Sequence, residues 1–154
     1  MLLTTVSLMP NNEGFTLIEL LVVITIIAVL SVIGMVAYSG FLKNSRDAKR
    51  QSDLRIIQSA LEDYHSDQIY YPASIQQGTS LTSPNGRIYL NQIPKDLKSD
   101  QSYSYTPSPL GCSGTGTSPT CTSYCLYAKF EGSNVPPSDQ GCSASGYNFG
   151  ITRP

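Results

Sequence analysis

An almost entirely apolar run near the N-terminus, residues 15–42, constrains this chain more than any other feature. It holds 28 residues and one charged side chain, Glu19. A helix needs about 20 apolar residues to cross a bilayer, whereas a cleaved secretory signal has a basic start and an apolar core of about 7–15 residues. The preceding residues 1–14 contain no Lys or Arg. The run therefore predicts a membrane-spanning helix, although a plain anchor leaves Glu19 unexplained.

Glu19 has two interpretations. An ionisable side chain inside a membrane helix costs a few kcal/mol and is rare unless it has a partner or a function. Glu19 also lies only about 6 Å, by helical rise, inside the apolar boundary. From there its side chain can extend to the interface, which requires no function. The residue alone does not decide between these two interpretations.

The residues around Glu19 favour a function. The string Gly14-Phe15-Thr16-Leu17-Ile18-Glu19 at the start of the apolar run resembles the processing motif of type IV prepilins and type II secretion pseudopilins. The resemblance implies that a prepilin peptidase cuts after Gly14 and that the new N-terminus, Phe15, is methylated. It also implies that Glu19 acts in processing and assembly, where its charge can neutralise the α-amine of a neighbouring subunit in a filament core of low dielectric.

The sequence departs from the family pattern at several positions. Family leaders usually carry Lys or Arg just before the glycine, where this chain has Glu13. Met9 is an alternative start that leaves a short leader, MPNNEG. Many relatives also have a proline partway along the helix. This chain has only Gly34 and Gly40, at which a local unwinding is one open alternative.

The helix is expected to continue beyond the apolar run as an amphipathic helix over residues 43–67, a stretch without Pro or Gly. Apolar residues recur there at helical spacing and predict one buried stripe: Leu54, Ile57, Leu61 and Tyr64. Lys43 with Asp47, and Lys49 with Asp53, are spaced for i,i+4 pairing. The charged segment 43–53 is interpreted as a solvated helix face in preference to a lipid-binding or DNA-binding surface. A long helix of this kind, from about residue 16 to residue 67, resembles the pilin spine.

Residues 68–154 are expected to form a small β-sheet head. Tyr70-Tyr71-Pro72 ends the helix, and the stretch 89–96 resembles the segment that precedes the sheet in pseudopilins and related pilins. Alternating patterns predict short antiparallel strands at 102–106, 124–130 and 147–151, while Pro84 and Asn85-Gly86 are assigned to a loop. Within 124–130, one face should pack on the helix stripe: Tyr124, Leu126, Ala128 and Phe130.

Four cysteines, all in the last third, predict two disulfides and an oxidising compartment: Cys112, Cys121, Cys125 and Cys142. Three connectivities are possible, and we favour Cys112–Cys121 with Cys125–Cys142. The sequence contains no C-x-x-C pair, the spacing that would indicate a zinc site. Glu131 and Asp139 are the only acids of the C-terminal tail, too few to predict the calcium site that major pseudopilins often hold.

Two features of the sequence predict opposite orientations of the chain in the membrane. Lys43, Arg46, Lys49 and Arg50 directly follow the apolar run, and the positive-inside rule alone would keep the C-terminus in the cytoplasm. The cysteines and the family resemblance indicate the opposite. We therefore expect a single-pass membrane protein whose head lies outside the cytoplasm, and which reaches a cell-surface filament after assembly.

The sequence thus predicts an α+β, pilin-like chain: a leader (1–14), a membrane and filament-core helix (15–42), an exposed helical half (43–67) and a head (68–154). Its nearly balanced charge gives no reason to expect nucleic acid as a partner. His65 is the single histidine, and no catalytic set can be assembled around it, so neither an enzyme nor a cofactor is expected.

The function expected from these features is that of a structural filament subunit. Its partners would be copies of itself or other pilins, prepilin peptidase, the inner-membrane assembly machinery, and membrane lipid before assembly. Two alternatives stay open: a type II secretion pseudopilin, and a monomeric, membrane-anchored extracellular binding protein.

Overall fold

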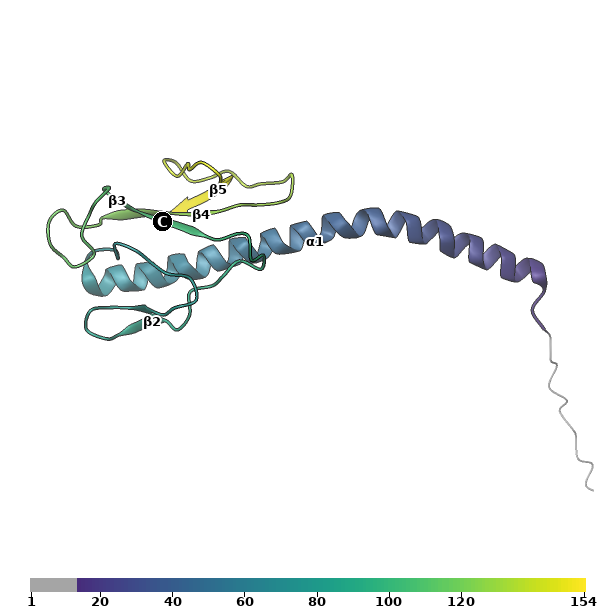
Figure 1. The fold of residues 1–154 in the computed structure, drawn as a ribbon, viewed down its shortest axis with the longest axis horizontal. Helices are drawn as coiled ribbons and strands as arrows, with labels where there is room; N and C mark the ends of the chain where they lie inside the picture. Colours follow the sequence, from purple (N-terminus) through teal and green to yellow (C-terminus); the bar gives the residue numbers. More distant parts are fainter. Residues whose placement is uncertain (1–13) are drawn as a thin grey trace, which may run out of the picture. The chain divides into compact units, whose positions relative to one another are not determined.

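The computed structural model describes residues 14–154, and its dominant element is one helix, α1, spanning Leu17–Gln68 (Figure 1). These bounds agree with the expected 16–67 to within one residue. The helix is continuous through Gly34 and Gly40, so no unwinding occurs at either glycine. Backbone contacts divide the chain into two units, one ending at Ser39 and the other comprising Gly40–Pro154.

The helix ends at a strained residue. Ile69 follows Gln68 with φ of 66°, in the left-handed region, and its amide donates to the His65 carbonyl at 2.8 Å. Glycine is the usual residue at such a helix end, because a β-branched side chain fits this conformation poorly. Pro72 follows three residues after Ile69 and prevents the helix from resuming.

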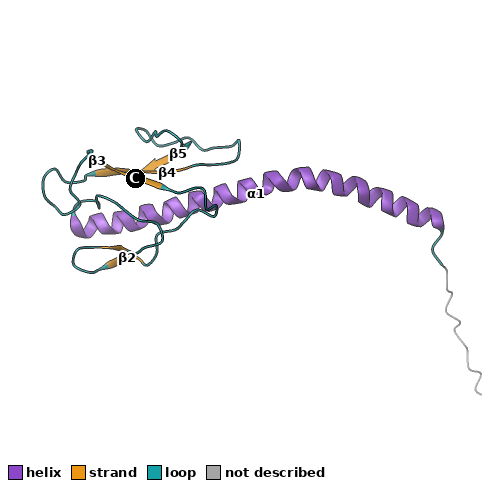
Figure 2. Cartoon of the chain, in the orientation of Figure 1, coloured by secondary structure: helices purple, strands orange, loops and turns teal. Residues whose placement is uncertain are grey.

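Two antiparallel sheets complete the second unit (Figure 2). The larger sheet has the order β3-β4-β5, formed by Ser104–Ser108, Ser123–Ala128 and Phe149–Thr152. Tyr105 pairs with Leu126, which in turn pairs with Ile151. These are the three strands expected from the sequence, displaced by one or two residues at their ends.

The smaller sheet was not predicted. Leu81–Thr82 (β1) pairs with Ile88–Leu90 (β2) across a turn that contains Gly86 at φ of 85°. The interpretation of this region as a plain loop is therefore wrong. The Asn85-Gly86 pair, a strong hairpin signal between apolar residues, was the sign that could have revealed it.

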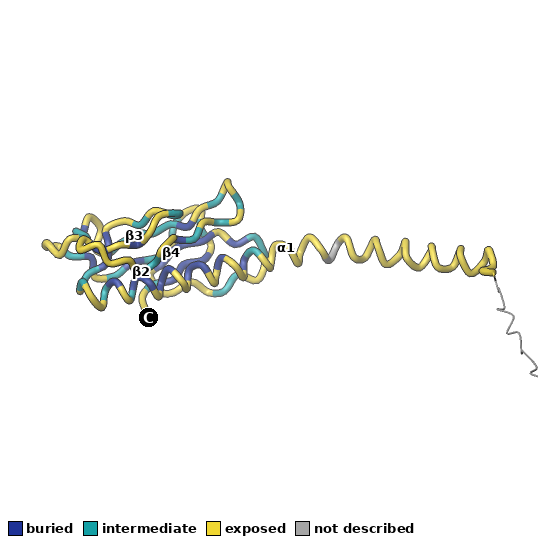
Figure 3. The backbone as a smooth tube through the Cα atoms, turned by 90° about the horizontal axis from the view of Figure 1, so that it is seen from below, coloured by how far each residue is buried: buried dark blue, intermediate teal, exposed yellow. Residues whose placement is uncertain are grey.

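The core of the second unit lies between α1 and the larger sheet (Figure 3). The predicted helix stripe is buried, and so is the predicted face of β4 with the residue beyond it: Leu54, Ile57, Leu61, Tyr64, Tyr124, Leu126, Ala128 and Phe130. Leu81 of β1 and Ile93 of the following loop join the same cluster. Matching the 3.6-residue period of the helix to the two-residue period of the strand thus located this core correctly.

Candidate functional site

The predicted processing site lies at the very start of α1. Gly14 and Phe15 precede the helix, and both are exposed. Thr16 occupies the N-cap position, so Glu19 is the third residue of the first turn. Residues 1–13, including Glu13 and the alternative start Met9, lie outside the described part of the chain.

Thr16 and Glu19 form a reciprocal capping box. The backbone amide and the hydroxyl of Thr16 both donate to Oε2 of Glu19 at 2.8 Å. In return, the amide of Glu19 donates to Oγ1 of Thr16 at 3.3 Å. A capping box satisfies amides that have no partner within a helix, and the Glu19 charge also suits the positive end of the helix dipole. The sequence analysis missed this role, although the spacing Thr-x-x-Glu before an apolar run is its signature.

The second oxygen of Glu19 is not used by the cap. Among the described residues, none hydrogen-bonds to Oε1. The carboxylate lies in a shallow, mostly apolar groove that it shares with Phe15, Ile18, Val22 and Val23. Within residues 14–154, one carboxylate oxygen of Glu19 therefore has no partner and can accept a hydrogen bond from a cation of another chain.

The apolar side chains that follow are exposed along the helix. Phe15 is 90% exposed, and the other large apolar residues from Leu17 to Met35 are also exposed. In the described residues, α1 is the one helix long and apolar enough to cross a membrane. An apolar surface of this extent indicates a partner or a lipid environment, because soluble monomers rarely expose one.

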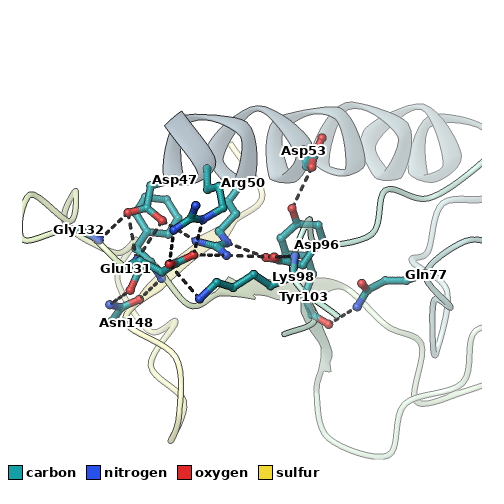
Figure 4. A network of polar contacts seen from close by, with 12 residues as sticks. Asp47, Arg50, Asp53, Gln77, Asp96, Lys98, Tyr103, Glu131, Gly132 and Asn148 are labelled. Atoms are coloured by element: carbon teal, nitrogen blue, oxygen red, sulfur yellow. Dashed lines mark hydrogen bonds and ion pairs between the residues drawn. The ribbon is translucent and has the colours of Figure 1, made fainter. Parts of the chain in front are cut away.

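A second constellation joins the other half of α1 to the head (Figure 4). Arg50 is 1% exposed, and three carboxylates surround its guanidinium. It donates to Asp96 at 2.6 and 3.0 Å and to Asp47 at 2.7 Å, and it lies 2.8 Å from Glu131. A buried charge is tolerated only when paired in this way.

Glu131 is the acceptor at the centre of this network. Arg46 binds it through two nitrogens at 2.9 and 2.7 Å, and Lys98 lies 3.1 Å away. The hydrogen bonds from Arg46 hold the pKa of Glu131 well below its usual range, with Arg50 and Lys98 adding to the effect against the opposing effect of burial. Burial raises the pKa of Asp96, but hydrogen bonds from Arg50 and from the Lys98 amide outweigh it, so this pKa is also lowered.

Asp47 caps the loop that carries Glu131. Its carboxylate accepts the amides of Glu131 at 3.0 Å and of Gly132 at 2.7 Å. Six residues further along the helix, the buried Asp53 accepts the Tyr103 hydroxyl at 2.9 Å and pairs with Lys49. The helix is therefore fixed to the head by charged contacts at one end of the core, and by apolar contacts together with hydrogen bonds to Glu62 along the rest.

This network corrects one interpretation of the sequence. Segment 43–53 is not simply a solvated face, because Asp47, Arg50 and Asp53 are buried. Lys49–Asp53 pairs as expected, but Asp47 pairs with Arg50 instead of Lys43. The spacing held a usable signal: Asp47 and Arg50 extend the stripe of Leu54, Ile57 and Leu61 by the same steps of three and four residues.

A smaller cluster surrounds Glu62, whose carboxylate accepts the hydroxyls of Tyr71 at 3.0 Å and Tyr124 at 2.8 Å. His65 stacks on the Tyr71 ring with centroids 4.5 Å apart. No hydrogen bond joins the His65 ring to a Ser, Cys or acidic side chain in the described part of the chain. The contacts around His65 are those of a packing residue.

The cysteines form the two disulfides Cys112–Cys121 and Cys125–Cys142, the pairs favoured from the sequence. Across residues 14–154 no group of three or more His, Cys, Asp or Glu is placed to hold a metal ion. The two tail acids considered for calcium have other partners: Glu131 binds the cations above, and Asp139 accepts the Thr152 amide at 2.8 Å.

Comparison with known proteins bears on the first of these sites. The family model for the prokaryotic N-terminal methylation motif matches residues 9–35, which include Gly14, Phe15 and Glu19. Neither the curated proteins nor the solved structures gave a significant match to the chain. The methylation motif is the signal motif of type IV pilins and pseudopilins, and its match here supports a type IV pilin-like or pseudopilin precursor.

Proposed function

We propose that this chain is a structural subunit of a type IV pilus-like filament, cut after Gly14, methylated at Phe15 and assembled through α1. The observation that carries the proposal is the position of Glu19, a carboxylate in the first helical turn with one oxygen free of partners among the described residues. Cleavage would create an α-amine at Phe15, and the free oxygen of a neighbouring Glu19 would neutralise it. In an apolar filament core an unpaired charge is costly, so this pair would set the register between subunits.

The exposed apolar half of α1 supports assembly. It would lie first in lipid and later against the equivalent helices of other subunits, so its surface would stay out of water throughout. Prepilin peptidase and the inner-membrane assembly machinery would be the partners at the two stages. The disulfides support a head outside the cytoplasm, where such bonds persist.

The basic residues after the apolar run no longer weigh heavily against this orientation. Arg46, Lys49 and Arg50 pair with carboxylates of the folded second unit. These ion pairs explain why basic residues are clustered directly after the apolar run, and cytoplasmic retention is not needed to account for the cluster. The head therefore presents much less net positive charge at this position than the sequence suggests.

The pilus subunit and the secretion pseudopilin differ in their C-terminal acids. The Tyr-Tyr-Pro exit and segment 89–96 favour a pseudopilin, whereas the disulfides favour a pilin. The partners of Glu131 and Asp139 also favour a pilin. A calcium ion of the kind that pseudopilins often hold would have to displace Arg46, Arg50 and Lys98 from Glu131. We therefore prefer the pilus-like filament.

The decisive variants separate the charge of Glu19 from its cap. Glu19→Gln keeps an oxygen that can accept the Thr16 donors but removes the charge, whereas Thr16→Ala removes the capping hydroxyl and keeps the charge. We expect Glu19→Gln to abolish filaments in sheared cell-surface fractions and in electron micrographs, and Thr16→Ala to retain them. Asp63→Asn, an exposed carboxylate on the same helix, is the matched control.

Processing is tested separately by mass spectrometry of the mature N-terminus. A methylated Phe15 is expected. A mature chain that still begins at Met1 or Met9 would contradict the proposal, as would normal filaments from Glu19→Gln. An anchored monomer that never forms filaments would instead identify a membrane-attached binding protein.

A further inference from the structure

The turn between β1 and β2 carries an asparagine that is followed by a glycine. Asn85 and Gly86 are both exposed, and no residue of the described chain hydrogen-bonds to the Asn85 side chain. Apart from its chain neighbours, no heavy atom lies within 4 Å of the position that a Cβ of Gly86 would occupy. The Asn85 carboxamide can therefore approach the Gly86 nitrogen without meeting another side chain.

This arrangement permits a reaction within the chain that needs no enzyme and no oxidant. The Gly86 amide nitrogen attacks Cγ of Asn85, a bond forms between these two atoms, and the bond from Cγ to Nδ2 breaks. Nδ2 leaves as ammonia with the proton of the Gly86 amide. Water then opens the cyclic imide at either carbonyl, which gives aspartate or isoaspartate, the isomer whose backbone runs through Cγ.

The other asparagines of residues 14–154 lack this combination of features. Each is followed by a residue with a side chain, which hinders ring closure: Asn44, Asn91, Asn134 and Asn148. The Asn148 amide is also held at both ends, because it accepts the Phe130 amide at 2.7 Å and donates to the Phe130 carbonyl at 3.0 Å. Asn91 and Asn134 are exposed outside helices and strands, so they are internal controls for the following residue.

Hydrogen bonds of the folded turn slow the reaction. The Gly86 amide donates to the Ser83 carbonyl at 2.9 Å, and this bond must open before the nitrogen can attack. The Ser83 amide donates to the Arg87 carbonyl at 2.9 Å, and its Oγ accepts the Arg87 amide at 3.1 Å. Because β1 has only two residues, local opening of this hairpin costs less than global unfolding. The reaction proceeds through such openings.

We propose that Asn85 is a self-modification site, converted by this route to aspartate and isoaspartate. Isoaspartate lengthens the backbone of the turn by one methylene and strains the bonds that Gly86 and Arg87 make to Ser83. Arg87 pairs with Asp67 in the last turn of α1, and its guanidinium lies 5.3 Å from the centre of the Tyr89 ring. The isoaspartate product therefore loosens the contact between the hairpin and the end of the helix. This inference goes beyond filament assembly and does not require it.

The test incubates the full chain in detergent at neutral pH, beside a free peptide of residues 81–90 that sets the time scale. Conversion is followed by proteolysis and mass spectrometry, and isoaspartate is identified with a methyltransferase specific for that residue. We expect both products at Asn85, formed more slowly than in the peptide, while Asn91 and Asn134 stay intact. In urea, where the turn is open, conversion should approach that of the peptide.

Two variants separate the modification from its structural effect. Asn85→Gln should stay unmodified, because its longer side chain closes a ring less readily, and its thermal midpoint should not fall during incubation. Asn85→Asp carries the charge on a normal backbone and should keep the starting midpoint, whereas the parent should lose stability as isoaspartate accumulates. Asn85 that is as intact as Asn91 and Asn134 after the peptide is spent would overturn the inference. None of these readouts depends on filaments, so this inference and the proposed function can fail separately.

Discussion

Replacing Arg50 by Met should destabilise the head more than any other single change to a charged residue. The substitution keeps a long apolar side chain but leaves Asp47, Asp96 and Glu131 without their shared cation. Removing one partner of a buried ion pair costs about 3–5 kcal/mol, since the remaining charge stays buried without compensation. Arg50 is 1% exposed, so solvent cannot replace the lost contacts.

The expected size of the effect can be stated as a shift in melting temperature. For a unit about the size of Gly40–Pro154, 1 kcal/mol corresponds to about 4 °C, so Arg50→Met should lower the midpoint by about 12–20 °C. Arg55→Met is the matched control, because Arg55 is exposed on the same helix and, among the described residues, hydrogen-bonds to Gln58 of that helix alone. Its effect should remain within about 0.5 kcal/mol.

The assay is thermal and urea unfolding of the full chain in detergent, followed by the near-ultraviolet circular dichroism of the head tyrosines. A double variant, Arg50→Met with Asp96→Leu, removes both partners and should be less destabilised than the sum of the single variants. A cost below about 1 kcal/mol for Arg50→Met would refute the reasoning, as would strict additivity in the double variant.

Three further predictions concern the same unit. The lowered pKa of Glu131 stabilises the fold fully above its ordinary value of 4.5, so unfolding midpoints in urea should fall as pH drops below that value. Ile69→Gly should raise the free energy of unfolding by about 1 kcal/mol, and hence the urea midpoint, since glycine adopts positive φ without strain. Removing Cys125–Cys142, which closes a separation of 17 residues, should cost about 3 kcal/mol in the same unfolding experiment under oxidising conditions.

Each of these has a result that would contradict it. A flat profile between pH 6 and pH 3 would mean, to within about half a kcal/mol, that Glu131 is no better stabilised in the folded state than in the unfolded one. A lower midpoint for Ile69→Gly would show that the Ile69 side chain stabilises the fold by more than its backbone strain costs. Equal midpoints for the oxidised parent and the Cys125→Ala, Cys142→Ala chain would refute the loop-closure argument.

The sequence was most informative where a structural period is locally regular. The stripe of Leu54, Ile57 and Leu61 and the alternation of Tyr124 and Leu126 each follow from neighbouring residues, and both are buried as predicted. The long helix was equally predictable because nothing within it breaks a helix. The disulfides could be anticipated only as one of three pairings.

The polar network could not be predicted in the same way. Arg50 is separated from Asp96 by 46 positions and Arg46 from Glu131 by 85, so only the fold brings them together. Charged residues on a helix are ordinarily exposed, so the burial of Asp47 and Asp53 was not predicted. The capping role of Glu19 was predictable from its spacing to Thr16, because Thr-x-x-Glu before an apolar run is the capping-box pattern.

The Thr16–Glu19 contact also affects the entropy of assembly. A glutamate side chain loses about 1.5–2 kcal/mol of rotational freedom when it is held in one conformation. Here two donors from Thr16 already fix Oε2 within the isolated subunit, while no residue of the described part of the chain bonds to Oε1. A neighbouring amine that binds Oε1 would meet an ordered acceptor, so most of the ordering is complete before two subunits meet, and each addition to the filament can proceed with a smaller loss of freedom.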